Sequence, residues 1–260
     1  MESELAKNSN IKKVKKAQPV TLADAMSRLD LMLEALEKEA RVALWAKATL
    51  EAGNDIVMAD YRGKMFEGAD CYNVLRNSTQ TALVLSLCKL FERPRGRQGQ
   101  SHVAALNRSD LASIPVFAHL LNQKRCRARM LERASGGWGE GSLGMSKVWE
   151  NDCLAALRNC DDAIRRLTAQ SGRRAALILA AFRNNHIAHL YTKPRPWNAN
   201  RYNELFLLLE IATDIVSHAS LAFRGCNLDL KEREQNWTDE ARAFWQPALA
   251  AAAAADQYAT

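Results

Sequence analysis

The sequence predicts an all-α fold, a helical bundle with extensions, for three reasons. Apolar residues recur at three- and four-residue spacing along most of the chain, as on one face of a helix. No segment shows the alternation of apolar and polar residues that indicates a strand. The 260 residues contain only 12 Gly and 6 Pro while 48% are hydrophobic, which argues against disorder and against a sandwich of many short strands.

Three helices are expected in the first half of the chain. Thr21 can cap the first, because Thr-Leu-Ala-Asp resembles a capping box with Asp in place of the usual Glu. The apolar pattern that follows ends or weakens at Gly53. The second helix is expected over about residues 70–92, before the helix-breaking Pro94. The third is expected over 113–133 and tolerates a proline in its first turn.

The second half begins with the glycine-rich segment 135–144, which must be a loop. It matches G-x-G-x-x-G by accident, because no strand precedes it as a dinucleotide site requires. Residues 146–190 are expected to form two helices parted at Ser171-Gly172. The next helix carries a clean apolar stripe and stops at Gly225. The stripe consists of Leu205, Leu208, Leu209, Ala212, Ile215, Val216, Ala219 and Phe223.

These patterns divide the chain into three parts: a flexible basic arm over 1–20, the helical bundle over 21–225, and a short helix with an alanine-rich tail over 226–260. The net charge of +7 suggests a polyanionic partner. The six cysteines show no C-x-x-C pair, which favours reduced thiols in a cytosolic protein. The lysine-rich N-terminus lacks the apolar core of a signal peptide. We therefore expect a cytoplasmic protein without a membrane partner.

The most informative segment follows residues 175–182, which are apolar all round and are expected to be fully enclosed. After them comes Arg183-Asn-Asn-His-Ile-Ala-His-Leu190, whose polar side chains would be costly to bury unpaired. A helix end that lines a cleft would satisfy them. An imidazole exchanges protons near neutral pH, and a guanidinium clamps phosphate oxygens. Together with an orienting amide, these groups suffice for metal-free RNA cleavage by 2′-OH attack, which spares DNA.

The spacing of the two charged groups raises a geometric difficulty. His189 follows Arg183 by six positions, so on a straight helix the two differ by about 120° in direction and by roughly 9 Å in height. They would not converge on one phosphate. Either the helix is distorted near its end, or two copies of the segment meet at a two-fold axis. The second alternative predicts a homodimer with a composite site.

Two segments now resemble a known family. Arg183-Asn184 followed by His189 is similar to the R-x(4–6)-H signature of HEPN domains, and Phe182 to Leu190 resembles the abortive-infection, AbiU-type branch. Leu87-Cys-Lys-Leu-Phe-Glu92 is similar to a helix-end motif of that branch, although an aspartate is more usual at Glu92. The resemblance spans roughly residues 25–225.

This resemblance implies a HEPN-like bundle of four to five core helices that dimerises and cleaves RNA without a metal or organic cofactor. The product would be a cyclic phosphate, and the protein would act in phage defence or as a toxin, with a possible antitoxin or defence partner. Arg183 and His189 would be the catalytic pair, Asn184 their support and His186 an accessory. Some HEPN domains only bind, so the alternative is a non-catalytic adaptor for RNA or a partner protein.

Basic residues flank this segment on both sides in the sequence. They are either solvated faces or contacts for an RNA backbone. The expected RNA-binding residues are Arg95, Arg97, Arg125, Arg127, Arg129, Arg173, Arg174, Lys193 and Arg195. A zinc site at His186 and His189 is disfavoured, because no Cys, Asp or Glu lies in the adjacent turns.

Overall fold

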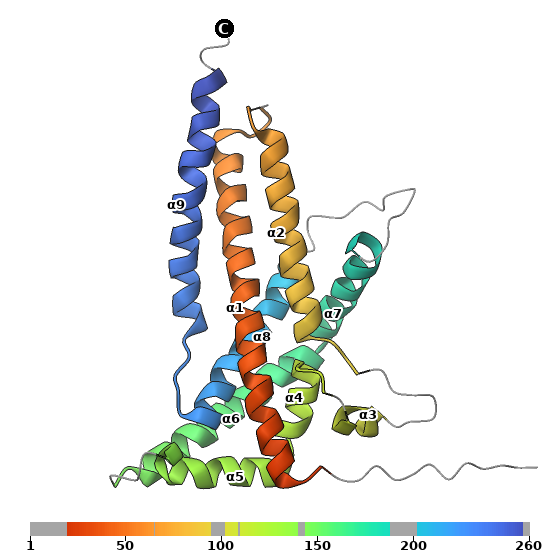
Figure 1. Cartoon of the computed structure of the whole chain (residues 1–260), viewed down its shortest axis with the longest axis vertical. Coiled ribbons are helices and arrows are strands. Elements are labelled where there is room, and N and C mark those ends of the chain that lie inside the picture. Colours follow the sequence, from red (N-terminus) through yellow and green to blue (C-terminus); the bar gives the residue numbers. More distant parts are fainter. Residues whose placement is uncertain are drawn as a thin grey trace, which may run out of the picture.

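The computed structural model describes residues 20–64, 66–94, 102–108, 110–139, 144–187 and 202–256. Every regular element in these ranges is helical (Figure 1), which confirms the all-α prediction. The helices are α1 (Leu22–Asp60), α2 (Ala69–Leu90), α3 (His102–Arg108), α4 (Ile114–Leu121), α5 (Lys124–Ser135), α6 (Ser146–Thr168), α7 (Gln170–Phe182), α8 (Tyr202–Arg224) and α9 (Leu230–Asp256).

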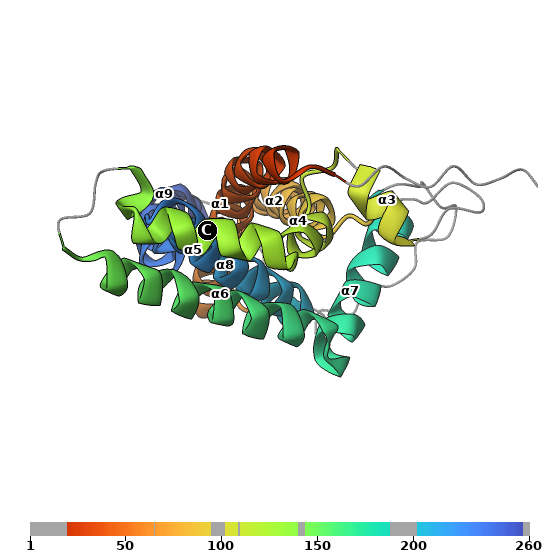
Figure 2. The same ribbon diagram turned by 90° about the horizontal axis from the view of Figure 1, so that it is seen from below.

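The long helix α1 organises the bundle. It lies beside α2 on one side and α9 on the other, and it also packs on α8 (Figure 1). Viewed from below, α5 and α6 lie side by side under α8, while α7 stands at one edge of the molecule (Figure 2). The groove that Arg183 lines is at this edge.

The core forms where α1, α2, α4, α6 and α8 meet, and the apolar stripe expected on α8 is buried as predicted. Burial of each large aliphatic side chain contributes about 1.5–3 kcal/mol, so this stripe fixes α8 at the centre. Within the described residues, α8 is the one helix long and apolar enough to cross a membrane by length and composition. Because 61% of its apolar window is buried inside the bundle, it has the character of a core helix.

Helix α1 begins as predicted, because the Thr21 hydroxyl accepts a hydrogen bond of 3.1 Å from the Asp24 amide. The expected weakening at Gly53 is wrong, and the helix continues to Asp60. A Cβ on Gly53 would lie 3.0 Å from the Trp245 ring of α9. The glycine therefore permits close approach of another helix and does not end its own.

Helix α9 is longer than the short helix and alanine tail that the sequence suggested. It runs unbroken over Leu230–Asp256 along α1. The Trp245 indole donates to the carbonyl of Thr49 (2.9 Å), and the Tyr61 hydroxyl donates to the carbonyl of Leu249 (2.6 Å). These bonds and a small aromatic core hold the helix against the end of α1.

The single helix expected over 113–133 is wrong, because the chain breaks between α4 and α5. Gln123 has an extended backbone (φ −72°, ψ 124°), which turns α5 onto α6. The Arg127 guanidinium donates to the carbonyl of Leu121 (3.0 Å) and so satisfies an acceptor at the break. This turn depends on tertiary contacts and not on a local breaker such as proline.

Helices α6 and α7 part at Ala169, two residues before the expected position. Gly172 instead lies in the first turn of α7, where a Cβ would meet the carbonyl oxygen of Arg166 at 2.4 Å. Glycine therefore lets the backbone of α7 approach the end of α6 closely. This tight corner sets the direction in which α7 leaves the bundle (Figure 2).

Trp138 packs against the bundle in the described part of the glycine-rich loop. A Cβ on Gly225 would lie 2.6 Å from its ring, and its indole donates to the carbonyl of Ala222 (3.4 Å). Gly225, with φ 70°, ends α8 as predicted. The loop is thus fastened to the end of α8.

Candidate functional site at the end of α7

The polar segment after the apolar helix begins with a change of helical geometry. Residues Arg183–Ile187 form a π-helical turn that contacts α2. Turns of this kind are rare in proteins as a whole, and those that occur are often at functional sites. A distortion here is one of the two arrangements that the spacing of Arg183 and His189 left open. His189 lies outside the described residues, so its direction is not part of the structure.

Arg183, the first residue of this turn, is held by its neighbour. Its half-buried guanidinium donates from Nε and Nη2 to the Asn184 Oδ1 at 3.3 and 3.2 Å. An amide oxygen that accepts two bonds from one guanidinium restricts its orientation. Asn184 is therefore placed where an orienting residue for Arg183 must be.

Arg183 also lines a groove of ≈ 720 Å³ at the edge of the bundle. The groove lies between the C-terminal end of α2, the end of α6 and α7. Its lining comprises Cys88, Phe91, Glu92, Arg93, Leu167, Thr168, Arg173, Ala176, Leu177, Leu179, Ala180 and Arg183. Cys88, Phe91 and Glu92 from the segment 87–92 thus line one groove together with Arg183, which begins the polar segment.

Cys88 of α2 lies close enough to Arg183 for the arginine's charge to affect the pKa of its thiol. Burial raises the pKa of its thiol to about 11, the positive charge of Arg183 acts in the opposite direction, and the Glu92 carboxylate raises the pKa further. At neutral pH the thiol is therefore protonated, and it is a poor nucleophile. It forms part of the groove wall and leaves the charge of Arg183 uncompensated by a thiolate.

The groove has an excess of positive charge. Arg93, Arg173 and Arg183 line it against one carboxylate, Glu92. Arg173 is anchored through its Nε, which donates to the carbonyl of Thr168 at 2.6 Å. Its other guanidinium nitrogens can bind an anion. Such a concentration of guanidinium groups in a concave site favours phosphate oxygens.

Residues 175–182 are not fully enclosed, contrary to expectation. Ala175, Leu179 and Phe182 are buried, whereas the Leu177 side chain is 72% exposed. Helix α7 packs on α8 and α2 with one face only, because it stands at the edge of the molecule (Figure 2). An apolar pattern cannot show whether the rest of the protein is large enough to cover the second face. The exposed side chain of Leu177 therefore adds apolar surface to the groove.

The expected RNA-binding residues are scattered. Arg173 lines the groove, and Arg174 on the same helix pairs with Glu204 at 3.2 Å. The three arginines of α5 do not line it: Arg125 donates to Val20 and Gln123, Arg127 to Asp161, and Arg129 to Glu132. Arg127 binds the carboxylate of Asp161 with two nitrogens, which gives it a structural role between α5 and α6.

Several expected site residues cannot be placed. Arg95, Arg97, His189, Lys193 and Arg195 lie outside the described residues, and so does the side chain of His186. Arg93, which was not assigned to the site from the sequence, joins it because α2 ends beside α7. Its signal in the sequence was its position directly after the Leu87–Glu92 segment.

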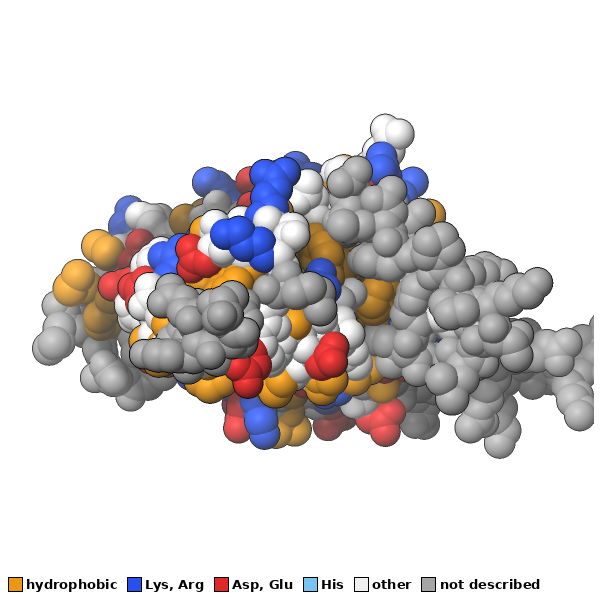
Figure 3. Space-filling model, turned by 90° about the horizontal axis from the view of Figure 1, so that it is seen from above, with side chains coloured by type: hydrophobic (Ala, Val, Ile, Leu, Met, Phe, Trp, Pro, Cys, Tyr) orange, Lys and Arg blue, Asp and Glu red, His pale blue; other side chains and the backbone are white. Residues whose placement is uncertain are grey.

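The described residues at the upper end of the molecule carry charges of both signs. In Figure 3, Lys and Arg side chains alternate with Asp and Glu and with hydrophobic groups over the described residues of this face.

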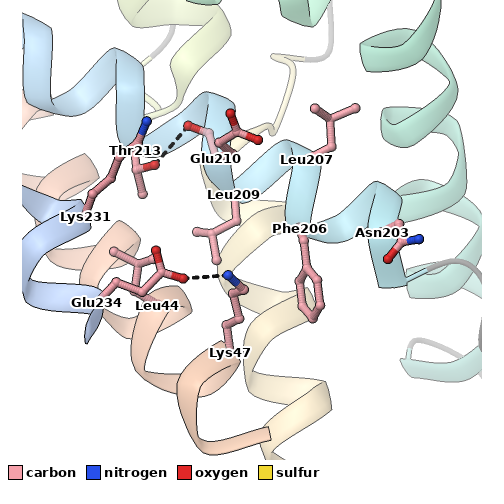
Figure 4. A pocket seen from close by; sticks show the side chains of 10 residues that line it. All are labelled: Leu44, Lys47, Asn203, Phe206, Leu207, Leu209, Glu210, Thr213, Lys231 and Glu234. Carbon is pink, nitrogen blue, oxygen red and sulfur yellow. Dashed lines mark hydrogen bonds and ion pairs between the residues drawn. The ribbon is translucent and has the colours of Figure 1, made fainter. Parts of the chain in front are cut away.

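A second hollow of ≈ 540 Å³ lies between α1, α8 and α9 (Figure 4). Its charges are paired: Lys47 and Glu234 point toward one another and bond at 2.5 Å. Lys231 pairs with Asp214 at 3.0 Å, just outside the hollow. Since its cations already have protein partners, this hollow makes a weaker candidate site. Among the described residues, no group of three or more His, Cys, Asp or Glu could hold a metal ion.

The all-α bundle, with Arg-Asn at a distorted helix end facing a basic groove, defines a HEPN-like protein. The AbiU2 model of HEPN domains matches residues 26–244, and the chain belongs to this abortive-infection family. The match extends into α9, beyond residue 225, where the resemblance was expected to end. No curated protein and no solved structure matches the chain.

Proposed function

We propose that this protein is a metal-independent endoribonuclease that acts in phage defence, as a toxin in abortive infection. Arg183 clamps the scissile phosphate, Asn184 orients Arg183, and His189 transfers protons, with His186 as an accessory. The observation that supports this most is the Arg183 guanidinium, held by Asn184 at the wall of a positively charged groove. No cofactor takes part.

The proposed reaction uses the substrate's own nucleophile. His189 accepts the proton of the ribose 2′-OH while the 2′ oxygen bonds to the adjacent phosphorus. The bond from phosphorus to the 5′ oxygen of the next nucleotide breaks, and that oxygen takes a proton from water, while His189 returns to water the proton that it accepted. The products are a 2′,3′-cyclic phosphate and a 5′-hydroxyl. Arg183 stabilises the negative charge that develops on the phosphate oxygens.

A homodimer is part of the proposal, and α2 offers a surface for it. Val74 and Leu85 are 63% and 40% exposed. Eleven positions separate them, so they lie within about 20° of each other on the helix surface. Exposed apolar side chains on one face favour burial against another protein surface. Since the same helix ends at the groove, pairing of two copies with their α2 helices parallel would bring two grooves together.

The proposed compartment is the cytoplasm, where the RNA targets are. All six cysteines are free, and Cys126, Cys153 and Cys160 are buried as thiols, a state that a reducing compartment preserves. A toxin there needs restraint, and we propose an antitoxin or defence partner for this role.

The test is cleavage of single-stranded RNA in EDTA by the wild type, Arg183→Ala and His189→Ala. Arg165→Ala is a matched control, because Arg165 pairs with Asp162 outside the groove. Loss of either catalytic group should reduce cleavage by about 10²–10⁴-fold, and the products should end in cyclic phosphate. DNA of the same sequence should remain intact. Equal activity in all four proteins would refute the assignment.

The alternative function is a non-catalytic adaptor that binds RNA or a partner protein through the same groove. The positive lining that supports catalysis supports this function equally. A salt-sensitive RNA complex that stays uncut in the wild type would favour it.

A further inference from the structure

The groove contains a feature that a phosphate clamp does not need. Leu177 is largely exposed within it, between the small residues Ala176 and Ala180. Covering an exposed leucine side chain with a ligand removes its apolar surface from water, which is favourable. A site that only followed a sugar–phosphate backbone would gain nothing from this apolar strip. The groove is therefore both apolar and basic.

The order of these groups along α7 is basic, apolar, basic. Arg173 lies near the start of the helix, Leu177 one turn later, and Arg183 at the end. With a rise of 1.5 Å per residue, Arg173 and Arg183 are about 15 Å apart along the axis, with Leu177 between them. The ligand that matches this order has a flat apolar part between two anionic groups.

We propose that the groove is a nucleotide subsite, in which a base of single-stranded RNA lies on the Leu177 strip and its flanking phosphates bind Arg173 and Arg183. Leu177 is thereby a binding residue for the base, and Arg173 for the phosphate away from the scissile bond. The volume of ≈ 720 Å³ falls within the roughly 300–1,000 Å³ of small-molecule sites. This subsite rests on the proposed function only in taking RNA as the ligand.

Charge favours RNA over a protein as the occupant. Three arginines and one glutamate line the groove, so its lining attracts anions. Arg173 is already oriented by the Thr168 carbonyl, so less side-chain freedom is lost when it binds a phosphate. A second copy of the chain would have to bring an acidic surface to this place.

The experiment measures binding without cleavage. A fully 2′-O-methylated single-stranded RNA lacks the nucleophile, and its affinity is measured by fluorescence anisotropy over a range of salt concentrations. Arg173→Ala should weaken binding several-fold and reduce the slope of log affinity against log salt by about 0.7, the value for one phosphate contact on a single strand. Leu177→Ala should also weaken binding several-fold but leave the slope unchanged.

The base is tested by removing it. On an oligonucleotide of abasic residues, Leu177→Ala and the wild type should bind equally, because the partner of Leu177 is gone. Leu31→Ala, which truncates another largely exposed leucine on α1, and Arg165→Ala are matched controls outside the groove. Both should bind as the wild type does on every oligonucleotide.

Three results would overturn the subsite. The first is that Leu177→Ala binds RNA with wild-type affinity, and the second is that Leu177→Ala loses as much affinity on the abasic strand as on RNA. The third is that Leu177→Ala differs from the wild type in oligomeric state, measured by size-exclusion chromatography with light scattering. The last would assign the strip to a protein interface. If unmodified RNA is cut while Leu177→Ala and Arg173→Ala bind normally, the subsite fails and the nuclease stands. If the binding pattern appears without cleavage, the nuclease fails and the subsite stands.

Discussion

Arg183 donates two hydrogen bonds to the side chain of the residue that follows it, Asn184. Neighbouring side chains on a helix point about 100° apart, so the long arginine must fold back to reach the amide. Cys88 and Glu92 approach from α2 on the other side of the groove. The charge of Arg183 is thus fixed in place without a protein counter-ion bonded to it among the described contacts.

Asn184→Ala should reduce RNA cleavage by about 10–100-fold, because a guanidinium displaced by even 1 Å loses much of its effect on the reacting phosphate. Asn184 is exposed, so the free energy of unfolding should change by less than about 0.5 kcal/mol. Cleavage rates and urea unfolding curves check the two parts. Asn185→Ala is the neighbouring control and should retain activity. Wild-type cleavage by Asn184→Ala would remove the orienting role.

The proposed dimer predicts that Val74→Glu yields a monomer. A carboxylate in the centre of an apolar contact would have to be desolvated, which costs several kcal/mol. Light scattering after size-exclusion chromatography measures the mass, and cleavage should fall with it, since the site is composite. Met58→Glu, at another exposed apolar position on α1, should remain dimeric. A wild type that is monomeric at all working concentrations would contradict the composite site.

Local signals accounted for much of the fold. The Thr21 cap and the stop at Gly225 involve groups within a few residues of each other, so the sequence displays them. The α8 stripe was predictable because a helix at the centre of a bundle repeats its apolar residues along its whole length. The family signature likewise identified Arg183, which lines the groove, because its residues are close together in the sequence.

The errors arose where distant segments meet. Gly53 was expected to weaken α1, but its role is set by Trp245 of α9. The apolar run 175–182 was expected to be enclosed. Helix α7 lies at the edge of the bundle and packs with one face only, so Leu177 is exposed. Neither partner can be identified from a pattern of spacing. The binding of RNA by Arg127 stays a prediction, and the contact of its guanidinium with Asp161 of α6 is a further partner that spacing did not identify.

Gly172 links the fold to the site. In Gly172→Ala the new methyl group would meet the carbonyl oxygens of Arg166 and Leu167 at 2.4 and 2.5 Å, so α7 must shift away from α6. We expect a loss of roughly 1–3 kcal/mol in the free energy of unfolding. The rate of RNA cleavage should fall by more than the loss of folded protein explains, because Arg183 moves with the helix. Ser171→Ala, next to it and exposed, should be neutral; a neutral Gly172→Ala would show that the corner has room.

The contact of Arg127 with Asp161 predicts an effect on stability and not on catalysis. Two charge-assisted bonds, one of them 2.8 Å long, join α5 to α6 and raise the pKa of Arg127. Both side chains are partly exposed, so Arg127→Ala should cost roughly 1–2 kcal/mol in the free energy of unfolding, measured in urea. Arg129→Ala, whose partner Glu132 is local and exposed, should cost about 0.5 kcal/mol or less. RNA cleavage by both variants should equal that of the wild type below their unfolding transitions.

His218 on α8 gives a pH dependence whose sign is fixed by burial. Desolvation lowers its pKa below the ordinary 6.5, Lys231 lowers it further, and Asp214 opposes them. Between pH 6.5 and the folded-state pKa, the unfolded chain binds more protons than the folded one, so stability falls as the pH falls through this window. His218→Gln removes this contribution and should lose less stability than the wild type between pH 7.5 and 5.5. Urea unfolding at both pH values measures the difference. An equal loss of stability in the two proteins would show that the pKa of His218 is the same in the folded and the unfolded state.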